Sequence, residues 1–254
     1  MTRGEYRFYE CENPSCALRF TGTESMPRWN RCPLCRSKIH IVASVQNPNE
    51  GKALAANVDR WQVDALLDNI RSAWNVGSII RTSDGIGIRK IYICGFSPTP
   101  EHPKVKKTAL GAETTIPWEQ SNNGVSFTRE LKTRGNILWA LEDLPGATPL
   151  FQVEVPVQKA PIVLIVGNEL SGIDPGIIEL CDRVISIPMI GTKRSYNVAI
   201  AFSIAASFLV YRLGFSATAT PTGPEEYFQA PYCLLEQAAR HRPARCKARH
   251  ALHR

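Results

Sequence analysis

Four of the eight cysteines lie within the first 35 residues, in the pattern C-x4-C-x15-C-x2-C. They are Cys11, Cys16, Cys32 and Cys35. Two close pairs at this separation are typical of a structural zinc site, because each pair can supply two corners of a tetrahedron. Two disulfides are the alternative. The N-terminus MTRGEYRFYE has no apolar signal segment, so we expect a cytoplasmic protein without a membrane anchor, and a reducing compartment favours zinc over disulfides.

Three polar constellations could carry other chemistry. They run over Asn69–Thr82, Gly167–Gly172 and Ile187–Asn197, each at the expected junction of an apolar run and a helix. In open α/β sheets such junctions bind ligands. Glu169 lies in a glycine-flanked turn, where glycine lets a backbone approach a ligand closely. Ser195 is a candidate N-cap for the apolar helix that follows.

The elements that must position these residues alternate between residues 57 and 214. Apolar, strand-like runs are expected at Val63–Leu67, Lys90–Cys94, Ile137–Leu141, Ile162–Val166 and Val184–Ile187. Helical spacings lie between them, which predicts an α/β domain on a mainly parallel sheet. The run Val198–Tyr211 is too short for a membrane span and favours a buried helix. Cys94 and Cys181 have no thiol or histidine near them in sequence and are interpreted as buried hydrophobic residues.

The flanking segments differ in composition. Residues 1–45 have strand-like stretches at Arg7–Tyr9 and Ile39–Ala43 around the cysteines, which predicts a zinc ribbon. We interpret residues 46–56 as a linker and residues 215–254 as a mostly disordered tail, with a short helix expected near Leu234–Ala239. The net charge is +7, but residues 240–254 hold six basic residues and no acidic one, so the remaining chain is nearly neutral. Such a tail fits either an arm that binds a polyanion or a solubilising end.

Two nucleotide-binding fingerprints are absent from the constellations. Gly85-Ile86-Gly87 lacks the third glycine of a dinucleotide-binding turn. Gly167–Gly172 has P-loop glycine spacing, but Ile173 and Asp174 stand where Lys and Ser/Thr are required. Neither a Rossmann dinucleotide site nor an NTPase is supported.

Taken together and in this order, the three constellations resemble the motifs of the SpoU (TrmH-like) RNA ribose 2′-O-methyltransferases of the SPOUT superfamily. The resemblance covers residues 57–214 and rests on N-x5-N-x-G-x3-R-T from Asn69, GNE-x2-G from Gly167 and IPM-x-G-x3-S-x-N from Ile187. It implies a SPOUT-type parallel sheet with a C-terminal trefoil knot, a homodimer, and S-adenosylmethionine (AdoMet) as cofactor. A knot would be an exception to the rule that chains do not thread their own loops.

The resemblance also implies site residues. The cofactor-binding set is Leu141, Gly167, Ile187, Met189 and Tyr196. The catalytic and RNA-facing set is Asn75, Arg81, Glu169, Ser195 and Asn197. Members of the family commonly have Leu at the position of Tyr196 and Ser at that of Ala199, so the shape of the adenine pocket is expected to differ. The zinc ribbon lies outside the shared core.

The implied reaction is attack of a ribose 2′-oxygen of structured tRNA or rRNA on a sulfonium methyl group, which requires alignment and removal of the hydroxyl proton. By resemblance Arg81 is the base, although a guanidinium scarcely loses its proton in proteins. Arg81 could instead hold a phosphate and stabilise the oxyanion, or be an ordinary surface charge. The rival hypothesis is a zinc-ribbon RNA-binding protein whose second domain binds without catalysis. Methylation of a base is disfavoured because the SpoU motifs are the ones that match.

Overall fold

The computed structural model describes residues 5–23, 30–46, 62–155 and 160–216. The chain divides into two compact units, Met1–Asn57 and Val58–Arg254. The expected linker from residue 47 onward, the short helix near Leu234–Ala239 and the basic residues of the tail lie outside the described residues.

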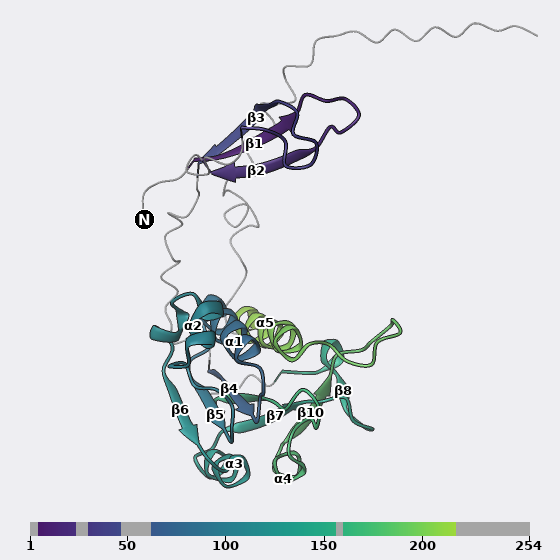
Figure 1. Ribbon diagram of the computed structural model, residues 1–254. Helices are drawn as coiled ribbons and strands as arrows, with labels where there is room; N and C mark the ends of the chain where they lie inside the picture. Colours follow the sequence, from purple (N-terminus) through teal and green to yellow (C-terminus); the bar gives the residue numbers. More distant parts are fainter. Residues whose placement is uncertain (1–4, 24–29, 47–61, 156–159, 217–254) are drawn as a thin grey trace, which may run out of the picture. The chain divides into compact units, whose positions relative to one another are not determined.

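The first unit is a three-stranded antiparallel sheet. Its strands are β1 (Glu5–Cys11), β2 (Arg19–Thr23) and β3 (Ile39–Gln46), in the order β2-β1-β3 (Figure 1). A register shift between Phe8 and Tyr9 leaves one extra residue in β3, a β-bulge. Tyr9 stacks on Phe20 of the neighbouring strand, with ring centroids 5.5 Å apart. Cys11 ends β1, and the other three cysteines lie in the connections at the same end of the sheet.

The second unit is built on a seven-stranded sheet whose paired strands are all parallel, in the order β6-β5-β4-β9-β7-β10-β8. The strands are β4 (Val63–Asp68), β5 (Ile91–Cys94), β6 (Trp118–Ser121), β7 (Ile137–Leu141), β8 (Thr148–Pro149), β9 (Ile162–Val166) and β10 (Arg183–Ser186). The predicted parallel α/β domain is confirmed. The trefoil knot stays a prediction.

Helices cover both faces of this sheet (Figure 1). On one face lie α1 (Ala73–Ile86), α2 (Pro103–Ala109) and α5 (Val198–Ser216). On the other lie α3 (Gly124–Thr133) and α4 (Pro175–Ile178). Successive strand residues point to opposite faces, so β4 contributes Ala65 and Leu67 to one core and Leu66 to the other.

The apolar run after Asn197 forms α5, whose buried face includes Phe202, Ala205 and Leu209, as predicted. Within the parts of the chain that the structure describes, no helix is long and apolar enough to cross a membrane. Cys94 is fully buried and Cys181 is half-buried; burial raises the pKa of each thiol to about 12, in keeping with a packing role.

Helix α2 packs directly against α1 at Gly77. A Cβ placed on Gly77 would lie 1.9 Å from Oγ1 of Thr108 and 2.5 Å from the carbonyl oxygen of Val105, so any side chain there would separate the helices. The contact brings the exposed lysines of α2 next to α1.

The amino end of the sheet carries an ion pair whose carboxylate is buried and whose guanidinium is half-exposed. Asp64 on β4 is fully buried and accepts two hydrogen bonds from the Arg89 guanidinium, at 2.9 and 2.6 Å, and one from the Tyr92 hydroxyl at 3.2 Å. These hydrogen bonds with Asp64 raise the pKa of Arg89 above its already high ordinary value. The cluster lies at the amino ends of β4 and β5, whereas the three motifs follow the carboxyl ends of strands, so its role is structural.

Candidate active site and metal centre

The four predicted thiolate ligands converge in the first unit. Their Sγ atoms all lie within 4.8 Å of one another, with Cys11 to Cys35 at 3.4 Å and Cys16 to Cys32 at 3.7 Å. A tetrahedral zinc with Zn–S bonds of about 2.3 Å requires sulfurs roughly 3.8 Å apart, so the donor set fits this metal in type, number and spacing. Cys11 and Cys32 are buried, which would shield the metal from solvent on one side.

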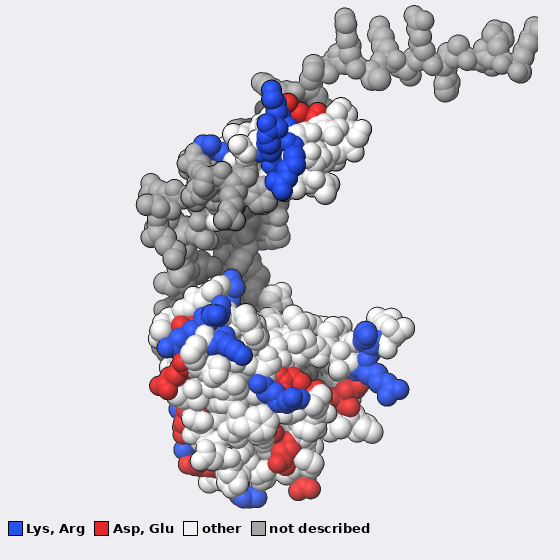
Figure 2. Space-filling model, viewed as in Figure 1, with Lys and Arg blue, Asp and Glu red and all other residues white. Residues whose placement is uncertain are grey.

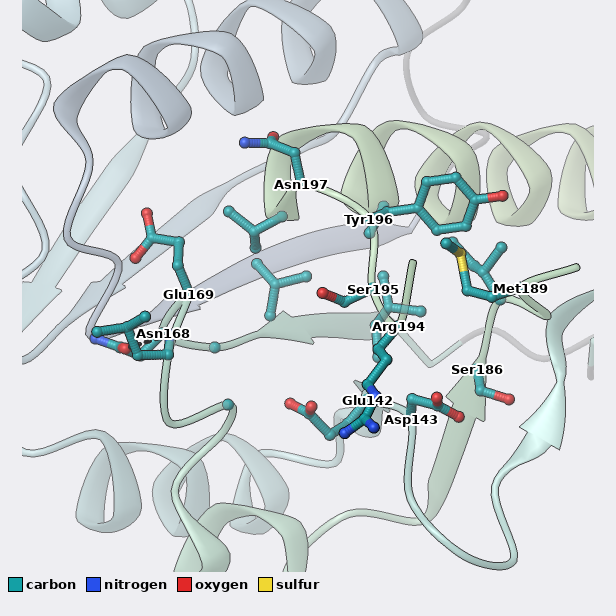
Figure 3. Close-up of a pocket in the computed structure, with 18 residues that line it drawn as sticks. Glu142, Asp143, Asn168, Glu169, Ser186, Met189, Arg194, Ser195, Tyr196 and Asn197 are labelled. Atoms are coloured by element: carbon teal, nitrogen blue, oxygen red, sulfur yellow. Dashed lines mark hydrogen bonds between the residues drawn. The ribbon is translucent and has the colours of Figure 1, made fainter. Parts of the chain in front are cut away.

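In the second unit a cavity of about 470 Å³ opens beyond the carboxyl ends of β7, β9 and β10 (Figure 3). This volume is within the usual range for small-molecule and cofactor sites. Among its lining residues are all five members of the predicted cofactor-binding set: Leu141, Gly167, Ile187, Met189 and Tyr196. Glu169, Ser195 and Asn197 of the predicted catalytic set line the same cavity.

Glu169 joins the second motif to the first. Its carboxylate accepts hydrogen bonds from the backbone N–H groups of Arg71 (2.9 Å) and Ser72 (3.0 Å) and from the Asn75 side-chain amide (2.8 Å). Ser72 is the N-cap of α1, so the carboxylate also lies at the positive end of that helix. Burial raises the pKa of Glu169, but these hydrogen bonds lower it by more, and the net pKa is below the ordinary value. Glu169 is therefore a weak base that is already bonded through both oxygens.

Asn197 joins the third motif to the first. Its side-chain amide donates to Oδ1 of Asn75 at 3.1 Å, while its own Oδ1 accepts from the backbone N–H of Ala199 at 2.9 Å. Helix α5 begins at Val198, so Asn197 caps it, and the prediction that Ser195 is the N-cap is wrong. The reason is local: the chain from Ser195 to Asn197 is not helical, and Asn is as good an N-cap as Ser.

These contacts form a continuous hydrogen-bonded chain from Glu169 through Asn75 to Asn197. In sequence, Asn75 is 94 residues from Glu169 and 122 residues from Asn197. Asn75 holds the central place because its amide nitrogen donates to one partner while its oxygen accepts from the other. The three motifs therefore meet at one edge of the cavity.

The glycines of the second motif permit a tight turn of the backbone. Asn168 and Gly172 exchange two backbone hydrogen bonds, of 3.0 and 2.9 Å. A Cβ on Gly167 would lie 2.4 Å from backbone atoms of Gly172 and Ile173. The backbone of the turn thus fills the space where a side chain of residue 167 would lie, so this turn requires glycine there. Gly167 also lines the cavity.

Residues 62–207 match the SpoU rRNA Methylase family. This chain belongs to that family. The 23S rRNA (guanosine-2′-O-)-methyltransferase RlmB of Neisseria meningitidis is 32% identical over 68% of this chain and 63% of that protein. The tRNA (guanosine(18)-2′-O)-methyltransferase of Aquifex aeolicus is 33% identical over 60% of this chain and 72% of that protein. The chain thus spans slightly less than two thirds of the first relative.

Solved structures of the same family have this fold. The A. aeolicus TrmH/SpoU tRNA-modifying enzyme superposes with a TM-score of 0.56 and 26% identity, over 72% of this chain and 91% of that one. A putative RNA methyltransferase of the TrmH family from Porphyromonas gingivalis superposes with a TM-score of 0.55 and 25% identity, over 70% of this chain and 68% of that one. The resemblance inferred from the motifs is confirmed at the level of family and fold.

Arg81 lies apart from the other predicted catalytic residues of the SpoU unit. It is exposed on α1, nearly two turns after Asn75, and is not one of the residues that line the cavity. A catalytic role for Arg81 therefore depends on how RNA, or a second subunit, approaches α1.

The motif-based prediction missed three charged residues of the cavity wall. Glu142 and Asp143 follow β7 directly, and Arg194 precedes Ser195 (Figure 3). Their position in the sequence could have indicated Glu142 and Asp143, because these two acidic residues directly follow a buried strand, at the carboxyl ends of the strands where the motifs also lie.

Proposed function

We propose that this protein transfers the methyl group of AdoMet to a ribose 2′-hydroxyl of structured RNA, either tRNA or rRNA. The observation that carries the proposal is the hydrogen-bonded chain Glu169–Asn75–Asn197 at the edge of a cofactor-sized cavity. Family membership and the names of the relatives support it, since those proteins are 2′-O-methyltransferases of rRNA and tRNA. The structure of an rRNA methyltransferase of Sinorhizobium meliloti, 25% identical, was solved with AdoMet bound.

The cavity suits this cofactor. Leu141, Ile187 and Met189 supply apolar surface for an adenine ring, and polar and charged groups lie on the remaining walls. When bound, AdoMet supplies an electrophilic methyl carbon on a positively charged sulfur. The protein's task is then to align the ribose oxygen with that carbon and to stabilise the oxygen as its proton leaves to water.

Each motif residue has a role in this task. Glu169 is a positioning residue, because both of its oxygens are engaged and its depressed pKa makes it a poor base. Asn197 and Ser195, at the mouth of the cavity, orient the hydroxyl. Arg81 acts as a cation, holding an RNA phosphate and stabilising the developing oxyanion, since its guanidinium stays protonated.

The surface near the site carries charge of the sign that RNA requires. Figure 2 shows Lys and Arg side chains gathered over α1 and α2. The exposed basic residues of these two helices are Arg81, Lys104, Lys106 and Lys107. Cations on this face would neutralise phosphates without reading bases, so they contribute affinity rather than choice of nucleotide.

We also propose that the second unit forms a homodimer. Three large apolar side chains are exposed within a few residues of the Asn75–Asn197 contact: Trp74, Tyr196 and Ile200. Exposed apolar surface of this kind marks interaction sites. A partner bound here would approach Arg81, which lies on α1 like Trp74. Light scattering should show a dimer for the wild type and a monomer for Ile200→Glu. Ile41→Glu, the same change at an exposed residue of the first unit, is the control.

We propose that the first unit is a zinc ribbon, in which Cys11, Cys16, Cys32 and Cys35 bind one structural Zn²⁺. The sulfur spacing supports it, and a sheet of three short strands has too small a core to be stable without a metal. A cytoplasmic location, proposed with the RNA substrate, would keep the thiols reduced.

One pair of measurements tests the function against its rival. Purified protein is titrated with AdoMet by calorimetry and is incubated with labelled AdoMet and bulk tRNA or rRNA, followed by digestion to nucleosides. Labelled 2′-O-methylnucleosides are the expected result. RNA binding without AdoMet binding would favour the catalytically inactive RNA-binding protein, and label on a base would overturn the ribose assignment.

A further inference from the structure

Glu142 is a half-buried carboxylate held in a fixed position in the cavity wall. Its backbone N–H donates to the carbonyl oxygen of Ile185 at 3.0 Å, and its Oε2 accepts from the N–H of Ile173 at 3.0 Å. A Cβ on Gly172 would lie 2.8 Å from the same Oε2. The turn that ends at Gly172 therefore packs directly against this carboxylate.

Most of the hydrogen-bonding capacity of the Glu142 carboxylate is unused among the described residues. Within the described segments it forms no ion pair, and a single N–H satisfies a group that can accept about four hydrogen bonds. Asp143 beside it also lines the cavity, and among the described lining residues Arg194 is the only cation. A carboxylate that a backbone N–H holds in a cavity wall, with its remaining acceptor positions free, is suited to accept charge-assisted hydrogen bonds from a cationic ligand.

We infer that Glu142 and Arg194 recognise the amino-acid end of the cofactor, with Glu142 accepting from the α-ammonium group and Arg194 donating to the α-carboxylate. The inference rests on the proposed function. AdoMet carries two cations, the ammonium and the sulfonium, and one carboxylate. The two carboxylates and one guanidinium of this wall form the complementary set.

The arrangement of the wall agrees with this assignment. In Figure 3 the Arg194 side chain is directed toward the side of the cavity where Glu142 and Asp143 lie, away from Asn197. Arg194 and Glu142 therefore lie on the side of the cavity away from Asn197. The apolar residues Leu141, Ile187 and Met189 remain for the adenine.

The test separates the amino-acid end from the rest of the cofactor. AdoMet, S-adenosylhomocysteine and methylthioadenosine, which lacks the amino-acid end, are titrated by calorimetry into wild type, Glu142→Gln and Arg194→Gln. Gln at position 142 keeps an oxygen for the Ile173 N–H, so the turn is retained. Glu179→Gln, the same change at an exposed residue outside the cavity, is the control.

Each cavity variant should bind AdoMet and S-adenosylhomocysteine about tenfold or more weakly, the loss expected for one charge-assisted hydrogen bond, and methylthioadenosine unchanged. Unchanged AdoMet affinity in both variants overturns the inference. Loss for AdoMet alone would show that the sulfonium is recognised instead, and equal loss for methylthioadenosine would show a contact with the nucleoside; either result also overturns it. A wild type that binds none of the three overturns the proposed function itself.

Discussion

Replacing Glu169 by Gln should destabilise the second unit, because the carboxylate joins two motifs at the start of α1. Oε1 accepts from the Ser72 N–H and the Asn75 amide, and Oε2 accepts from the Arg71 N–H. Gln retains one acceptor oxygen and turns an NH₂ group toward a donor. The loss is one charge-assisted hydrogen bond and a negative charge at a helix N-terminus, about 1–2 kcal/mol after allowance for partial exposure. That is roughly 2–8 °C in Tm for a domain of this size.

The same variant should remove a pH dependence of stability. The hydrogen bonds that Glu169 accepts outweigh the effect of burial and place its pKa below the ordinary value of 4.5. A carboxylate with a depressed pKa stabilises the fold fully above its ordinary pKa and loses that contribution as pH falls through the folded value. The difference in free energy of unfolding between wild type and Glu169→Gln should therefore be constant near neutral pH and shrink below about 4.5.

Urea unfolding followed by helical circular dichroism measures this difference, since the described helices all belong to the second unit. Glu179→Gln, at an exposed carboxylate, should match the wild type throughout. The reasoning is refuted if Glu169→Gln is as stable as wild type at neutral pH, or if its deficit persists unchanged in acid.

Three other outcomes are expected. Arg81→Ala should lower the rate of methyl transfer by a factor on the order of 10², because a preorganised charge at the reacting oxygen is lost. Calorimetry should show unchanged AdoMet affinity, because Arg81 does not line the cavity. Full activity of the variant would contradict a catalytic role. Metal analysis should find one zinc per wild-type chain and little in Cys32→Ser, whose first unit should become protease-sensitive; zinc-free wild type would contradict the ribbon. Arg89→Met should cost about 1–3 kcal/mol in urea unfolding, because the buried Asp64 carboxylate loses its charged partner but keeps the Tyr92 hydroxyl, whereas Arg134→Met, at an exposed pair, should cost under about 0.5 kcal/mol; equal effects would contradict the structural role.

Much of the fold follows from local pattern. The apolar runs at Val63–Leu67, Ile137–Leu141 and Ile162–Val166 correspond to β4, β7 and β9, because strands buried on both faces need continuous apolar sequence. β6, with the sequence Trp118-Glu-Gln-Ser, was missed. It is the edge strand next to β5, so its side chains are only partly buried and carry no apolar signature.

The site was predictable as three motifs but not as a network. The partners of Asn75 lie 94 and 122 residues away, and no local periodicity encodes such contacts. The same limit applies to Gly167: the sequence suggested open space for a ligand, whereas the backbone of Gly172 and Ile173 occupies it. Glu142 belongs to none of the motifs, and the hydrogen bond between its carboxylate and the turn joins residues 31 apart in sequence, which no local pattern encodes.

The turn of the second motif touches both halves of the proposed reaction. On one side Glu169 holds the start of α1, the helix that carries Arg81. On the other side Ile173 donates to Glu142 in the cavity wall. A ligand that binds Glu142 would restrain the turn that holds the start of α1, so occupation of the cavity and ordering of α1 should be thermodynamically linked. Glu169→Gln should then weaken this linkage without removing any group from the part of the cavity wall that Glu142 and Arg194 form.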